Sequence, residues 1–340
     1  MNYFYTERLT HGLKTAFACL IGFGITRALH FYVDQWLIIT IIVVMCAQIS
    51  VGSMIQKSYM RFLGTLIGSI IAALTLYFFN VDEVVFAIVI AVSVLIFSYI
   101  ATSEKSFNEA GTLGAVTIVI ILISQNPTLT LVVERFIEIS AGILVAALVS
   151  QFVLPIHASK HLRDTQAATL RQLRDFYLAT LKSDDSQQVL LESYQKLDES
   201  IALSLIKQRK LATDSARELF VGVFNQKQFQ ELLQSEKEIL RSIAVMHHVY
   251  AVSPTARVLF ISEQMQNAFH ANIVATLENV AIDIAKAKKE KKIILPDVQV
   301  LKEFVFSQEE NFSRQERVYL DAYLFAAETL VAQLSHLADW

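Results

Sequence analysis

Long apolar runs fill the first 155 residues of the chain, with short polar segments between them. A helix needs roughly 20 apolar residues to cross the hydrocarbon core of a bilayer. The runs do not alternate polar with apolar residues, as the strands of a membrane barrel would. The second and fifth runs are short for a full crossing. The pattern predicts six membrane-spanning helices, at about Leu13–Leu29, Gln35–Ile49, Arg61–Phe79, Val84–Ala101, Gly111–Ser124 and Glu134–Leu154.

From Ala158 onward, the apolar residues recur at every third or fourth position instead. One such series is Leu170, Leu173, Tyr177 and Leu181. This spacing is typical of amphipathic helices, and their apolar stripes must be buried against one another. We therefore expect an all-α protein without strands. Its transmembrane domain would occupy residues 1–155, and a cytoplasmic bundle of four or five helices would occupy residues 156–340.

The composition supports this division into a membrane part and a soluble part. The chain is 54% hydrophobic and 18% charged, whereas soluble domains are about 45–50% apolar and about 25% charged. Residues 1–155 carry 15 charged side chains and residues 156–340 carry 46. The net charge of −3 indicates no nucleic-acid partner. The two cysteines, Cys19 and Cys46, form no metal-binding or redox motif.

The charges between the predicted spans indicate how the chain is oriented. The loops on one side carry Arg8, Lys57, Lys105, Lys160 and Arg163, and the opposite loops are acidic or neutral. Positive charge near the ends of spans marks the cytoplasmic side of a membrane. Both termini are therefore expected in the cytoplasm.

Polar residues within the predicted spans are the candidates for function. Arg61 opens the third span, and Thr65 and Gly68 follow it on the same helix face. Gly64 and Gly68 form a GxxxG pair, which lets the backbone of a neighbouring helix approach closely. Two interpretations of Arg61 remain open. Its guanidinium reaches the cytoplasmic interface, or it faces an internal water-filled path.

The sixth span opens with a second group of charges. Arg135 and Glu138 are three residues apart and can pair across one helix turn. A carboxylate at this depth is costly unless it is paired or hydrated. Glu138 is therefore either the proton-linked group of a coupled carrier or half of an ion pair that fixes the helix.

Lys14 and Arg27 bracket the first span. They lie roughly 20 Å apart along a helix and about 140° apart around it, so they do not line one narrow path on a straight helix. Arg27, near the outer end, is the better functional candidate because an isolated cation there attracts anions. Arginine also offers a two-pronged fork for carboxylates. Together with Arg61 and Arg135, these cations suggest a route for organic anions.

The second half contains no convincing catalytic or metal-binding motif. His157 and His161 share a helix face, but a zinc site needs further ligands. The basic run from Lys286 to Lys292 is either a solvated helix end or a contact with anionic lipid headgroups. We expect a protein that is not an enzyme and that uses neither a cofactor nor a metal.

The stretch from Trp36 through Thr40, Gln48 and Gly52 to the motif Arg61-Phe-Leu-Gly64-Thr65-Leu-Ile-Gly68 resembles the fusaric acid resistance and aromatic acid exporter family. The R-x-x-G-T-x-x-G motif is the most recognisable part. The series Arg135, Glu138 and Gly142 resembles the last membrane helix of that family, with Gly142 expected at a helix contact. Plant aluminium-activated malate transporters have a similar plan of six spans and a cytoplasmic helical domain.

The resemblance implies a multi-pass transporter of aromatic or other organic carboxylates in the bacterial inner (plasma) membrane. From the charged residues within the spans, we expect an exporter that is driven by protons. Arg61 and Arg135 would hold the carboxylate, and Thr65 and Gln48 would donate hydrogen bonds. Glu138 would carry the proton. The long exporters have two such units and this chain has one, so a homodimer is expected. The alternatives are a passive organic-anion channel of the malate type and a membrane scaffold that recruits partners through its cytoplasmic bundle.

Overall fold

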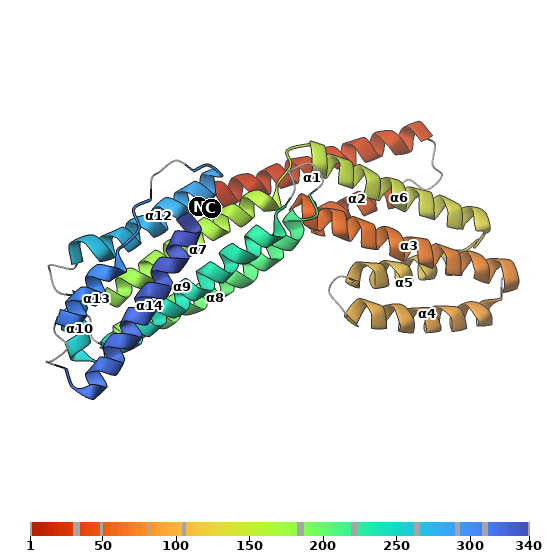
Figure 1. The fold of residues 1–340 in the computed structure, drawn as a ribbon. Helices are drawn as coiled ribbons and strands as arrows, with labels where there is room; N and C mark the ends of the chain where they lie inside the picture. The colour runs from red at the N-terminus through yellow and green to blue at the C-terminus, as the bar shows by residue number, and fades with distance from the viewer. Residues whose placement is uncertain are drawn as a thin grey trace. The chain divides into compact units, whose positions relative to one another are not determined.

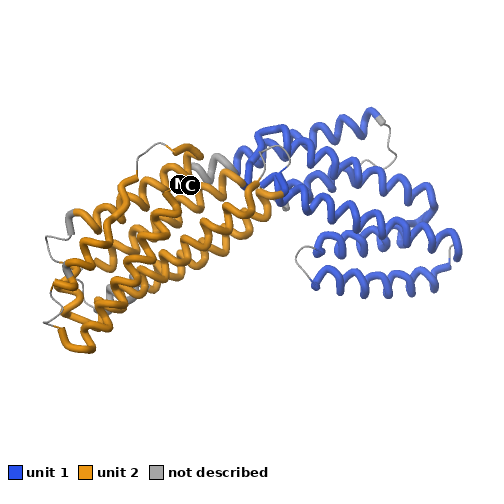
Figure 2. Tube along the Cα trace, viewed as in Figure 1, with its two compact units in different colours: residues 1–158, 217–221 blue, residues 159–216, 222–340 orange. Residues whose placement is uncertain are grey.

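The structure is a computed structural model that describes residues 2–29, 35–47, 50–79, 82–103, 107–181, 187–218, 224–261, 266–289, 293–307 and 312–338. Every regular element in these ranges is a helix (Figure 1). The predicted all-α class is therefore confirmed. The chain forms two compact units, shown in Figure 2. The first unit contains residues 1–158 and 217–221, and the second contains residues 159–216 and 222–340.

The first unit contains six helices within the described residues. They are α1 (Asn2–Leu29), α2 (Gln35–Ala47), α3 (Val51–Phe79), α4 (Glu83–Ser103), α5 (Asn108–Leu122) and α6 (Leu129–Phe152). The helix α3 begins ten residues before Arg61, where the third span was predicted to begin. The helix is longer than the predicted span because hydropathy marks only the apolar part of a helix, and the polar first turns of α3 are helical as well.

Three described helical segments are long and apolar enough to cross a membrane, namely Arg8–Ala28, Val51–Phe79 and Glu83–Ser103. The described parts of α2 and α5 have 13 and 15 residues. At about 1.5 Å per residue, each is shorter than the roughly 30 Å of a hydrocarbon core. The arrangement of six spans therefore stays a prediction.

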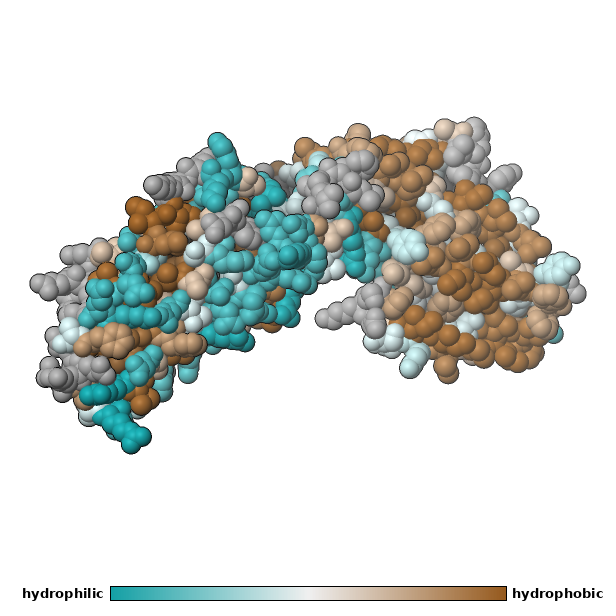
Figure 3. Space-filling model, in the orientation of Figure 1, coloured by the Kyte–Doolittle hydropathy of each residue, from teal (hydrophilic) through white to brown (hydrophobic). Residues whose placement is uncertain are grey.

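Apolar side chains lie on the outside of the first unit as well as in its core. Large exposed residues include Leu74, Leu95 and Tyr99. Figure 3 shows brown, apolar side chains over much of the visible face of this unit. A soluble protein rarely exposes so large a continuous apolar surface, whereas a lipid-facing surface requires one.

Glycine contacts hold α3 against α5. A Cβ atom placed on Gly64 would collide with the carbonyl oxygen of Ala110, and one on Gly68 would lie 2.7 Å from the carbonyl oxygen of Gly114. Gly114 in turn faces the ring of Phe97 on α4. These positions allow close backbone contact, which is the main source of helix association where no water is expelled.

The segment between the helices α8 and α9 contributes to the first unit. The Arg217 guanidinium donates a hydrogen bond to the Gln56 side chain on α3. The Glu218 carboxylate accepts one from the backbone N–H of Ala158 and lies 3.8 Å from Nδ1 of His157. These contacts anchor the start of α3 and the residues that follow α6.

Seven α-helices of the second unit lie within the described ranges, together with one π-helical turn. They are α7 (Ala158–Leu181), α8 (Gln187–Ser215), α9 (Gln226–Val252), α10 (Pro254–Ile261), α12 (Ala271–Lys286), α13 (Val298–Ser307) and α14 (Arg314–Ala338), with the turn η1 at Gln266–His270. This exceeds the expected four or five. Pro254 begins α10, a position that proline favours because it lacks an N–H, so one apolar stretch becomes two helices.

A polar cluster lies within the core of the second unit. Gln208 donates hydrogen bonds to Thr169 Oγ1 at 2.9 Å and to the carboxyl group of Glu236 at 2.8 Å. Burial raises the pKa of Glu236 to about 8, because desolvation disfavours the carboxylate more than the Gln208 hydrogen bond favours it. At the end of η1, the His270 ring shares a hydrogen bond with the Tyr177 hydroxyl. Burial lowers the pKa of His270.

The glycine contacts generate a matched pair of substitutions. We expect Gly64→Ala to destabilise the first unit, by roughly 1–3 kcal/mol, because its methyl group collides with the backbone of α5. Gly24→Ala is the control, since nothing lies within 4 Å of its Cβ position. Alanine also favours helix over glycine by up to about 1 kcal/mol. Thermal melting in detergent measures both, and equal melting temperatures would contradict the proposed contact.

Candidate functional site

Four polar residues form a buried face on α3, which we call the α3 polar face: Ser58, Arg61, Thr65 and Ser69. They follow one another at steps of three, four and four residues, which places them on one side of the helix. All four are buried. The three hydroxyl oxygens and Nε of Arg61 have no hydrogen-bond partner in the described part of the chain.

Such a series is unusual in a native protein. Buried polar atoms are nearly always hydrogen-bonded, and each unsatisfied one costs about 1–3 kcal/mol. Water or a polar solute beside the α3 polar face would supply the missing partners. The face is therefore the candidate in the first unit for a hydrated path or a binding surface, and either use requires the neighbouring helices to leave room beside it.

The Arg61 guanidinium shares its counter-ion with a second cation. Glu109, at the start of α5, lies 3.1 Å from Nζ of Lys57 and 3.8 Å from Nη1 of Arg61. The Arg61 side chain is only 9% exposed. Two positive charges thus face one carboxylate, and the longer contact belongs to the more deeply buried cation. The local excess of positive charge suits an anion.

The motif geometry explains how Glu109 reaches Arg61. Gly64 lies three residues after Arg61 and admits the backbone of Ala110. Glu109 precedes Ala110 directly. The close approach of α3 and α5 at the glycine therefore brings the carboxylate to the arginine one turn earlier on the same helix face.

A second charged group lies between α6 and α2. Arg135 donates a hydrogen bond from Nη1 to Glu138 at 3.0 Å, so the pairing expected from their spacing occurs. The centre of the Arg135 guanidinium lies 5.3 Å from the centre of the Trp36 ring, a cation–π contact. Glu138 is 2% exposed. Arg135 Nε has no hydrogen-bond partner within the ranges that the structure describes.

The turns that carry the two arginines are adjacent. Phe62 and Phe136, each one residue after an arginine, pack with their ring centres 5.7 Å apart. The sequence suggested instead that Arg61 opens its span on the cytoplasmic side of the membrane and Arg135 opens its span on the outer side. The difference arises because α3 starts at Val51, so Arg61 lies well inside the helix.

Gly142 lies one turn after Glu138 and sets the distance between α6 and α2. A Cβ atom there would lie 2.8 Å from the carbonyl oxygen of Leu37 and 2.9 Å from Cβ of Thr40. The two helices therefore approach closely just beyond the charged pair.

The two cations of α1 are placed differently from each other. Lys14 is 2% exposed, and its ammonium donates hydrogen bonds to the carbonyl and hydroxyl oxygens of Ser150, at 2.7 and 3.3 Å. Arg27 is exposed and lies over the ring of Phe23. The structure thus buries Lys14 and does not bring Arg27 to the other candidates. Gln48 lies outside the described residues.

Sequence reasoning missed Glu109, Ser58 and Ser69. A signal for the two serines was present, since they continue the spacing of Arg61 and Thr65 in both directions. Glu109 is one of only eight acidic residues before residue 156, but nothing in the sequence indicated which cation it meets. Among the described residues, no three His, Cys, Asp or Glu side chains are grouped as metal ligands.

The unsatisfied hydroxyls predict that water reaches the α3 polar face. In a protein whose Cys19 and Cys46 are replaced by serine, we expect Thr65→Cys to react with a small, water-soluble methanethiosulfonate reagent. The control is Ile67→Cys, because Ile67 is on the exposed apolar surface that would face lipid. Mass spectrometry of protein in lipid vesicles measures the modification. Modification of the Ile67→Cys variant alone, or of neither variant, would contradict a hydrated face.

Comparison with known proteins gives three matches. The model of the fusaric acid resistance protein family matches residues 8–289. The inner membrane protein YeeA of Escherichia coli K12 is 23% identical over 266 residues, which are 77% of this chain and 72% of that protein. The multidrug resistance protein MdtO of the same strain is 30% identical over 176 residues, or 49% of this chain. The match covers only about a quarter (25%) of MdtO.

Proposed function

Because the chain belongs to the fusaric acid resistance protein family, we propose that it exports small organic anions across the bacterial inner membrane. The inner membrane relative and the apolar helices support this location. The α3 polar face carries the proposal. A buried guanidinium with an unsatisfied nitrogen, next to unsatisfied hydroxyls, is otherwise too costly to keep in an apolar unit.

An organic carboxylate is the solute that fits these donors best. Arginine binds a carboxylate through two parallel hydrogen bonds, and Thr65 can donate a third from one turn further along α3. The rings of Phe62, Phe136 and Trp36 lie beside the two arginines in sequence or in space. Of these rings, that of Trp36 contacts an arginine directly and offers an apolar surface for the body of the solute, which supports an aromatic carboxylate.

In the proposed membrane arrangement, α1 to α6 all cross the bilayer and both termini lie in the cytoplasm. The helix α6 has 24 residues and a long apolar stretch after Glu138. The short helices α2 and α5 pack against the longer α6 and α3, which allows them to remain in the bilayer without reaching both surfaces alone. Residues 156–340 form the cytoplasmic part in this proposal.

Anion flux into vesicles that contain the purified protein tests the proposal. Using radiolabelled benzoate as the probe, we expect Arg61→Gln to reduce flux at least tenfold. A hydrogen bond to a charged group contributes about 1.5–3 kcal/mol, and about 1.4 kcal/mol corresponds to a factor of ten. The control is Arg8→Gln, because Arg8 is exposed on α1. Equal flux through both variants would reject the exporter and favour the membrane scaffold.

The same vesicles separate a proton-coupled exporter from a passive channel. Glu138→Gln keeps an oxygen that can accept the Arg135 hydrogen bond, but it cannot exchange a proton. We propose that Glu138 links transport to protons, so this variant should conduct benzoate down its gradient without responding to an imposed pH gradient. Un-ionised benzoic acid crosses a bilayer and follows a pH gradient unaided, so protein-free vesicles supply the background. A channel would show no response to the gradient above that background in the unmodified protein either.

A second copy of the chain is the proposed partner. The stretch shared with MdtO is 49% of this chain and 25% of that protein, so MdtO is about twice as long. Two copies of this chain would together have about the same length as one MdtO chain. Native mass spectrometry from lipid nanodiscs should then give a dimer, and a spectrum of monomers alone would reject this arrangement.

A further inference from the structure

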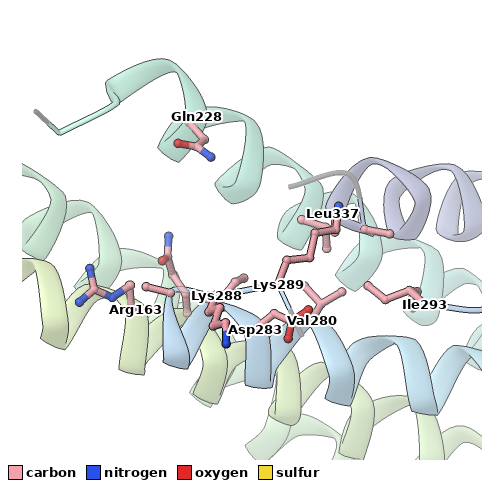
Figure 4. Close-up of a pocket in the computed structure, with 12 residues that line it drawn as sticks. Arg163, Gln228, Val280, Asp283, Lys288, Lys289, Ile293 and Leu337 are labelled. Atoms are coloured by element: carbon pink, nitrogen blue, oxygen red, sulfur yellow. The ribbon is translucent and has the colours of Figure 1, made fainter. Parts of the chain in front are cut away.

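The second unit contains a cavity of about 270 Å³, which we call the α12 pocket. It is lined by residues of α7, α9, α12 and α14 and by the segment that follows α12 (Figure 4). Ligand cavities in proteins commonly measure about 300–1,000 Å³. The α12 pocket lies just below this range and therefore suits a molecule of small size.

The charged residues of the lining are predominantly cationic. Three cations, Arg163, Lys288 and Lys289, line the cavity together with one carboxylate, that of Asp283. Arg163 and Lys289 form no ion pair with any described residue, and Nε of Arg163 is buried without a hydrogen-bond partner there. The C-terminal end of α12 carries the negative end of the helix dipole, which stabilises the lysines just after that helix. This effect does not explain the presence of Arg163, which belongs to α7.

An amide side chain lies one turn from Arg163. Gln166 lines the α12 pocket and is only 3% exposed as a whole residue, with no hydrogen bond to a described residue. Its spacing of three residues places it on the same face of α7 as Arg163. A ligand that accepts hydrogen bonds would pair with the amide and the guanidinium together.

The rest of the wall is apolar. Val280 and Ile284 of α12 and Leu337 of α14 are buried residues that line the same cavity. An inorganic anion would leave this surface unused. An anion with an apolar body would fill the cavity and place its charge at the cations, as small-molecule sites commonly combine a large apolar wall with a few polar anchors.

We propose that the α12 pocket binds a small organic carboxylate with an apolar body, at a site separate from the α3 polar face. The choice of a carboxylate rests on the proposed function. The cationic lining, the Gln166 amide and the apolar wall support anion binding by themselves. The basic run that follows α12 thereby gains a role other than contact with lipid headgroups.

Equilibrium dialysis of the purified full-length protein in detergent tests the site. The Arg61→Gln variant is used throughout, so that the α3 polar face does not contribute. We expect it to bind benzoate, and to bind the neutral analogue benzamide at least tenfold more weakly. Adding Lys289→Gln or Arg163→Gln should weaken benzoate binding at least tenfold. Adding Lys196→Gln, an exposed lysine of α8, should not change it.

The outcomes separate this proposal from the proposed function. Benzoate binding no stronger than benzamide binding, or binding unaffected by both Lys289→Gln and Arg163→Gln, would overturn the α12 pocket whatever the flux measurements give. Equal flux through Arg61→Gln and Arg8→Gln, together with intact benzoate binding, would overturn the exporter but not the α12 pocket. Binding of anionic-lipid vesicles through Lys289, without binding of free benzoate, would assign the cations to headgroups and reject the proposal.

Discussion

The first unit depends on how it accommodates the charge of Arg61 among apolar helices. Removing a guanidinium from water is expensive, and an ion pair repays the cost only when its geometry is good. Glu109 provides a partial counter-charge, at 3.8 Å, and is closer to Lys57 than to Arg61. Nε of Arg61, on the α3 polar face, has no hydrogen-bond partner among the described residues. The charge is thus kept in place but not fully neutralised, which is the condition that an anion-binding site requires.

Helix packing makes this arrangement possible. Gly64 and Gly68 allow α5 to approach α3 so closely that any side chain at Gly64 would strike the backbone of Ala110. The same contact delivers Glu109 to the charged turn of α3. The arginine and the glycine of the R-x-x-G-T-x-x-G motif therefore act together, since the glycine sets the position of the carboxylate that the arginine needs. Thr65, between the two glycines, adds a hydroxyl on the face that remains polar.

The sequence predicted the helical class and the close helix contacts at Gly64 and Gly68, because periodicity and small-residue spacing are local properties. It also singled out Arg61 and Thr65, which the structure buries. It did not predict pairings that depend on how helices pack. Glu109 became the partner of Arg61, and Lys14 rather than Arg27 was buried. Hydropathy also did not locate the start of α3, because its polar first turns are helical as well. The sequence therefore did not predict that the turns carrying Arg61 and Arg135 lie side by side. The sequence did not predict the α12 pocket either, because its lining residues come from four helices that are far apart along the chain.

The two arginines of the first unit differ in how readily they can accept a solute. Arg135 donates to Glu138 at 3.0 Å and stacks on Trp36, so a carboxylate that binds there must compete with an existing hydrogen bond. Arg61 has only a loose contact with Glu109, and its Nε has no partner among the described residues. A carboxylate at Arg61 would gain hydrogen bonds without breaking a good one. In the proposed transport route, the first binding step therefore belongs to Arg61, and Arg135 with Glu138 forms the adjacent group that a bound anion would disturb next.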